Sequence, residues 1–87
     1  MLSQRGEDWI KFGSKVLEHI EVYTVPQYGD APDDQVEDWS PETCVLAIKK
    51  YCARFGSNSR QGQEKLDLIK MAHFAQLAYD KMEKLNV

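Results

Sequence analysis

Apolar residues recur at helical spacing between Ser40 and Gly56. They form one stripe, which predicts a buried helix face: Cys44, Val45, Ile48, Tyr51, Cys52 and Phe55. Ser40 is a good N-cap, Pro41 suits the first helical position, and Gly56 supplies the left-handed residue that commonly follows a helix. The pattern therefore predicts a helix over 41–55 that ends in a defined way.

A second helix is predicted over 63–85, after a polar loop, so the two helices form an antiparallel hairpin. Its apolar positions cover more than one face: Leu66, Ile69, Met71, Ala72, Phe74, Ala75, Leu77, Ala78, Tyr79 and Met82. A helix that is apolar on two sides is either enclosed in a bundle or shared with another subunit. We therefore expect a homo-oligomer that forms through 63–85.

The first half of the chain predicts one amphipathic helix, over about 7–20, followed by an extended acidic linker over 21–39. Val22–Val25 is rich in β-branched and aromatic residues, and Pro26 ends the run. Such a segment either packs on the helices as irregular chain or pairs with a copy of itself. The fold class is all-α: a single three-helix domain over 1–87 with a C-terminal hairpin.

The chain has 87 residues, of which 43% are hydrophobic and 29% charged. A domain this short is marginal alone and often depends on a partner. It has no apolar stretch of the ~20 residues that cross a membrane, and its N-terminus lacks the apolar core of a signal peptide, so we expect a cytoplasmic protein without membrane contact. A net charge of −3 argues against bulk nucleic-acid binding.

The charges are segregated along the chain. Residues 30–42 carry six acids and no base, whereas 43–63 carry four bases and no acid. The loop 56–62 is polar and precedes a helix N-terminus, where free N–H groups favour an anion. Either the two segments simply attract each other and the loop is an ordinary connection, or the basic segment binds a phosphate group. In the second case the ligand-binding residues are Lys50, Arg54, Ser57, Asn58, Ser59 and Arg60, with Tyr28 or Tyr51 covering a ring.

Two stretches carry a resemblance to a known family. Lys50-Tyr51-Cys52-Ala53-Arg54, and after the loop Asp67-Leu68-Ile69-Lys70-Met71-Ala72-His73-Phe74, resemble a family of small phage-encoded helical proteins of unknown function, some of which are labelled nucleotide kinase. The resemblance covers 40–85 and implies roles for five positions: Lys50, Tyr51, Arg54, Asp67 and Lys70. The alternative is purely structural: Arg54 pairs with Asp67 to clamp the hairpin, and Tyr51 packs between its helices.

Paired carboxylates form a second motif. Glu64-Lys65-Leu66-Asp67 places two acids on one helix face, and Glu18-His19-Ile20-Glu21 does the same on the first helix. Glu64–Leu68 is similar to the second motif of all-α nucleoside triphosphate pyrophosphohydrolases, in which four carboxylates hold magnesium and activate water. The alternative is that these acids are solvated helix-face residues.

Other chemistry is weakly indicated. Cys44 and Cys52 lie about 12 Å apart along one helix, too far to form a disulfide with each other. A zinc site that joins them to His19 and His73 lacks the usual tight spacing, and no catalytic triad is present. Tyr28 and Trp39 lie in the linker and either attach it to the helices or stack on a ligand ring. No cofactor, metal or catalytic residue is predicted.

The leading functional hypothesis is a small accessory protein of phage or prophage type that binds a nucleotide or another phosphorylated small molecule at the 56–62 loop. A rival hypothesis is a protein-interaction module whose exposed helix face binds a host protein. The third is a magnesium-dependent pyrophosphohydrolase.

Overall fold

The computed structural model describes residues 1–30, 38–57 and 60–85. These residues form helices and connecting segments, with no β-strand among them, so the predicted all-α class is confirmed. The chain divides into two compact units, Met1–Asp33 and Asp34–Val87, each described below by itself. The prediction of one domain over 1–87 stays a prediction. Within the described ranges, no helix has the length and apolar character needed to cross a membrane.

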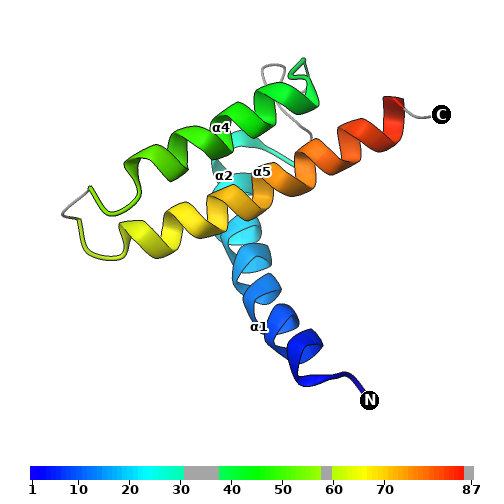
Figure 1. Ribbon diagram of the computed structural model, residues 1–87, viewed down its shortest axis with the longest axis vertical. Coiled ribbons are helices and arrows are strands. Elements are labelled where there is room, and N and C mark those ends of the chain that lie inside the picture. Colours follow the sequence, from blue (N-terminus) through cyan, green and yellow to red (C-terminus); the bar gives the residue numbers. More distant parts are fainter. Residues whose placement is uncertain (31–37, 58–59, 86–87) are drawn as a thin grey trace. The chain divides into compact units, whose positions relative to one another are not determined.

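The N-terminal unit is one run of helical backbone with three parts. They are α1 (Gln4–His19), the π-helix η1 (Ile20–Thr24) and α2 (Val25–Tyr28) (Figure 1). Ser3 caps α1, since its Oγ accepts a hydrogen bond from the Gly6 N–H at 3.1 Å. Gly29, with φ of 91°, ends the run.

The predicted extended linker is therefore wrong over Glu21–Tyr28, which is helical. β-branched residues cost an α-helix at most about 0.7 kcal/mol each, so they disfavour helix without forbidding it. At Pro26, a π-helical turn immediately precedes the ring, and the Val25 N–H bonds back to the Ile20 carbonyl. A π-bulge is a known way to accommodate a break in the regular hydrogen-bond ladder. The His19 and Tyr23 rings also stack at 5.2 Å, one turn apart.

The C-terminal unit is the predicted antiparallel hairpin of α4 (Pro41–Arg54) and α5 (Gln63–Leu85), which lie side by side in Figure 1. The Thr43 N–H donates to Ser40 Oγ at 3.2 Å, as expected for the N-cap. Phe55 is already extended, so α4 ends one residue earlier than predicted. Gly56 and Gly62, with φ of 82° and 81°, flank the connection.

The core of the hairpin is narrow. Cys44 is fully buried and Ala78 is 8% exposed. Trp39 stacks on Phe74 with ring centroids 5.9 Å apart, and Phe74 contacts Tyr51 at 6.0 Å. The predicted buried stripe of α4 is thus only partly correct: Val45, Cys52 and Phe55 are exposed. Within the hairpin, α5 covers only a narrow strip of α4, so the side chains on the flanks of the stripe stay exposed.

Candidate functional site

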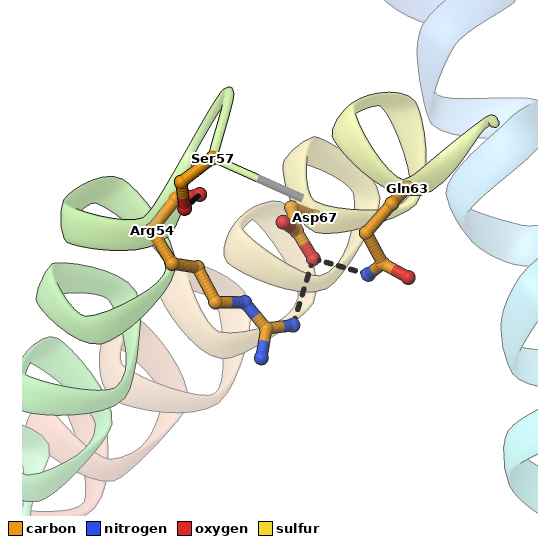
Figure 2. A network of polar contacts seen from close by, with 4 residues as sticks. All are labelled: Arg54, Ser57, Gln63 and Asp67. Carbon is orange, nitrogen blue, oxygen red and sulfur yellow. Dashed lines mark hydrogen bonds and ion pairs between the residues drawn. The ribbon is translucent and has the colours of Figure 1, made fainter. Parts of the chain in front are cut away.

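The loop end of the hairpin holds an ion pair between its two helices. Arg54, in the last turn of α4, donates from Nη2 to Asp67 Oδ1 at 3.0 Å. Gln63, one turn before Asp67 on α5, donates from Nε2 to the same oxygen at 2.8 Å. Figure 2 shows both dashed contacts converging on that oxygen. The Asp67 side chain is 2% exposed and that of Arg54 is 40% exposed, so the carboxylate is the enclosed partner.

The pKa of Asp67 is lowered, first by the hydrogen bond from Arg54 and against the effect of burial, which raises it. The hydrogen bond from Gln63 and the positive charges of Arg54 and Lys70 lower it further. The pKa of Arg54 is raised, chiefly by the same bond to Asp67. Both shifts indicate a charged pair at neutral pH. The structural alternative for Arg54 and Asp67, a clamp between the two helices, is confirmed.

One flank of the hairpin is basic and aromatic. The Arg54 guanidinium carbon lies 4.6 Å from the centroid of the Tyr51 ring, and Lys70 Nζ lies 5.9 Å from it. Arg54 Nε is buried and has no hydrogen-bond partner, which fits a guanidinium packed against a ring. Lys50 is exposed one turn before Arg54. We call Lys50, Tyr51, Arg54 and Lys70 the basic flank.

The predicted ligand-binding residues are only partly brought together. Tyr51 and Arg54 contact each other, and Ser57 Oγ donates to the Arg54 carbonyl oxygen at 2.6 Å, which places Ser57 at the end of α4. Arg60 is exposed, and its carbonyl accepts the Gln63 N–H at 3.2 Å. Tyr28 belongs to the N-terminal unit, where Gln27 Nε2 donates to its hydroxyl at 3.2 Å. Asn58 and Ser59 lie outside the described residues.

Two of these side chains have other structural roles. Arg54 is bonded to a buried carboxylate, and the Tyr51 ring contacts Arg54, Lys70 and Phe74. Gln63, the second donor to Asp67, was not predicted. Its spacing of four residues from Asp67 on a helix was the available signal, since glutamine and aspartate pair at that distance.

The opposite flank of the hairpin is apolar. Cys52 Sγ on α4 approaches Met71 Sδ on α5 at 3.5 Å, which marks where the helices meet on this side. From that contact, helical spacing places four further exposed residues on the same side as Cys52 and Met71. This apolar flank consists of Val45, Cys52, Leu68, Ala75 and Met82. The hairpin therefore presents charged and aromatic side chains on one flank and apolar side chains on the other.

The carboxylate motif is not assembled as a metal site in the described part of the chain. Asp67 is bonded to Arg54 and Gln63, so it does not offer a free carboxylate beside Glu64. Within 1–30, 38–57 and 60–85, no cluster of three or more His, Cys, Asp or Glu side chains has metal-binding geometry. Cys44 is buried on α4 and Cys52 is exposed two turns later, and both are free thiols.

Comparison with protein-family models, curated proteins and solved structures finds no match to this chain. The resemblance to small phage-encoded proteins stays a prediction.

Proposed function

We propose that the protein is a protein-interaction module whose hairpin binds a helix of a partner protein through its apolar flank. The observation that carries the proposal is the exposure of three large side chains there. Val45 is 54% exposed, Leu68 46% and Met82 53%. By contrast, the buried hydrophobic residues in the described part of the hairpin are two small ones, Cys44 and Ala78. Covering a half-exposed side chain of this size stabilises by roughly 1 kcal/mol.

The spacing on α5 supports a helical partner. Leu68, Ala75 and Met82 recur every seven residues, which is the repeat that keeps a seam facing a neighbouring helix. Ala75, at the centre of that seam, allows a partner backbone to approach closely. The partner is either a host protein, as the rival hypothesis from the sequence proposes, or a second copy that binds through α5, as expected for the predicted homo-oligomer.

The test compares two leucine substitutions. Leu68→Glu puts a charge on the apolar flank, and Leu46→Glu is the matched control, because Leu46 is 63% exposed on the side of α4 away from α5. Affinity purification with mass spectrometry, together with light scattering, measures bound proteins and self-association. We expect Leu68→Glu to abolish partner binding and Leu46→Glu to retain it. The circular dichroism spectra of the two variants are expected to be similar. Equal behaviour of the two variants would contradict the proposal.

A second candidate function is phosphate or nucleotide binding at the basic flank. Its supporting observation is charge: Arg54 and Lys70 lie near the Tyr51 ring against one carboxylate, Asp67, and Lys50 is exposed one turn before Arg54. Figure 2 shows one terminal nitrogen of Arg54 turned away from Asp67. Thermal-shift measurements against nucleotides, with and without magnesium, test this function. Binding at 100 times the dissociation constant stabilises by about 2.7 kcal/mol. A shift that is lost in Lys70→Ala supports phosphate binding, whereas a shift lost only in Glu64→Ala supports the pyrophosphohydrolase instead.

A further inference from the structure

Three aromatic side chains join the start of the hairpin to its loop end. Trp39, two residues before α4, stacks on Phe74 of α5 with ring centroids 5.9 Å apart and planes 15° apart. Phe74 in turn contacts Tyr51, near the end of α4, at 6.0 Å. The Arg54 guanidinium, in the last turn of α4, lies 4.6 Å from the centroid of the Tyr51 ring. We call Trp39, Phe74 and Tyr51 the aromatic series, and it connects the segment before α4 to the Arg54–Asp67 ion pair.

The position of Arg54 depends on the last ring of this series. Its Nη2 bonds to Asp67 Oδ1 at 3.0 Å, whereas its Nε is buried without a hydrogen-bond partner. The Tyr51 ring therefore provides the packing surface for the part of the guanidinium that Asp67 does not hold. The attraction between a cation and a ring requires the cation to stand over the ring face, so a rotation of Tyr51 moves the guanidinium or weakens this contact. Phe74 packs on Tyr51 and limits that rotation.

Trp39 lies where the segment that joins the two compact units enters the hairpin. The division between the units falls between Asp33 and Asp34, a few residues before Trp39, and Trp39 is only partly buried. Beyond the area that they bury, stacked aromatic pairs are favoured by roughly two- to twelvefold. The stack of Trp39 on Phe74 can therefore open while α4 and α5 remain folded.

We propose that Trp39 is a positioning residue for the Arg54–Asp67 ion pair: its ring holds Phe74 against Tyr51, and Tyr51 holds the guanidinium against Asp67. When Trp39 leaves Phe74, Arg54 is held less firmly and the basic flank offers more free positive charge. The segment that joins the two units thereby regulates the basic flank. This inference goes beyond both functional proposals, because it requires no bound ligand or partner.

A double-mutant cycle on the full chain tests the coupling. Trp39→Leu removes the stack and keeps an apolar side chain, and Asp67→Asn removes the ion pair at the far end of the series. Substitutions at sites without shared partners change the unfolding equilibrium constant by factors that multiply to within about twofold. Here we expect the equilibrium constant of the double variant, from urea unfolding followed by circular dichroism, to be at least about threefold smaller than that product. The reason is that Trp39→Leu has less of an ion pair left to disturb once Asp67 has lost its charge.

Two comparisons show whether the coupling passes through the aromatic series. In a Phe74→Leu background we expect the departure to fall to within about twofold, because Phe74 links Trp39 to Tyr51. Glu64→Gln is the matched control for Asp67→Asn, since Glu64 is an exposed carboxylate three residues earlier on α5, and its effect multiplies with that of Trp39→Leu. A cycle without the threefold departure, or a departure that persists in Phe74→Leu, overturns the inference.

Fluorescence gives a second measurement that leaves Trp39 in place. The chain has two tryptophans, so Trp39 is the remaining one in a Trp9→Phe background. There we expect Asp67→Asn to increase acrylamide quenching of Trp39 in the folded protein, because coupling between two sites acts in both directions, and Glu64→Gln to leave it unchanged. Equal quenching in the two variants, each shown to be folded by circular dichroism, also overturns the inference. Neither experiment contains a ligand, so the outcome is separate from partner binding, which Leu68→Glu tests.

Discussion

Arg54 and Gln63 both donate a hydrogen bond to the enclosed Asp67 carboxylate. Replacing Arg54 by alanine removes the first of these bonds and the positive charge, and it leaves the bond from Gln63. Removing one partner of a fully buried ion pair costs about 3–5 kcal/mol, because the other charge stays buried and uncompensated. Arg54 is 40% exposed, so water screens this pair and we expect a smaller loss than for a fully buried pair. For a unit of this size, each kcal/mol of lost stability lowers the Tm by roughly 4–8 °C.

The pH dependence of the stability lost in Arg54→Ala shows whether the cause is electrostatic. In the original chain the pKa of Asp67 is lowered in the folded state, so the carboxylate contributes stability above its unfolded pKa and loses it as the pH falls through the folded pKa. Without Arg54, the main cause that lowers the pKa of Asp67 is gone, while burial still raises it against the Gln63 hydrogen bond and the Lys70 charge, so the carboxylate contributes less stability at neutral pH. The Tm difference between the two proteins is therefore largest near pH 7 and shrinks towards pH 3.

Thermal unfolding followed by circular dichroism from pH 3 to pH 7 is the assay. Lys50→Ala is the matched control, because it removes the same charge one turn away at an exposed site, and it changes the Tm little at any pH. Asp67→Asn destabilises less than Arg54→Ala, since Arg54 then turns into solvent and no charge is stranded. A Tm difference for Arg54→Ala that is constant across the pH range would refute the electrostatic explanation and assign the loss to packing against Tyr51.

Two substitutions and one labelling reaction in the hairpin have further expected outcomes. Gly56→Ala forces a side chain into a backbone with φ of 82°, so it lowers stability by about 1 kcal/mol in urea unfolding, although nothing lies within 4 Å of the added atom. A thiol reagent labels the exposed Cys52 quickly and Cys44 only on unfolding, because Cys44 is fully buried and burial raises its pKa; equal labelling rates would contradict this. Phe74→Ala removes the ring that stacks on Trp39 and contacts Tyr51, which costs about 2–3 kcal/mol and shifts Trp fluorescence.

The hairpin was predictable because its limits are set by local chemistry. Ser40, Pro41 and Gly56 act within a few residues of themselves, and α4 and α5 begin where the sequence places them. The segment after His19 was not predictable in the same way. The preference of Val22–Val25 for extended backbone is a few tenths of a kcal/mol per residue, and a helix that is already formed outweighs it.

The candidate site shows the same division between local and non-local information. The pairing of Arg54 with Asp67 was foreseen as one of two alternatives, because a hairpin brings the end of α4 to the start of α5. The separation of the hairpin into a basic and an apolar flank depends on how α4 is rotated relative to α5. Contacts between the helices reveal that rotation, with Cys52 against Met71 on one side and Tyr51 against Lys70 on the other, and neither helix pattern alone contains it.

The role of Arg54 decides the order of the two functional proposals. A phosphate that binds at the basic flank either shares Arg54 with Asp67 or displaces that carboxylate, and a displaced carboxylate would be left buried without its cation. Lys50 and Lys70 then supply most of the attraction, and flexible lysines hold phosphate less rigidly than an arginine fork does. The apolar flank requires no such rearrangement, because its side chains are already exposed and gain free energy by simple coverage. We therefore propose protein binding ahead of phosphate binding, because it requires the smaller structural rearrangement of the hairpin.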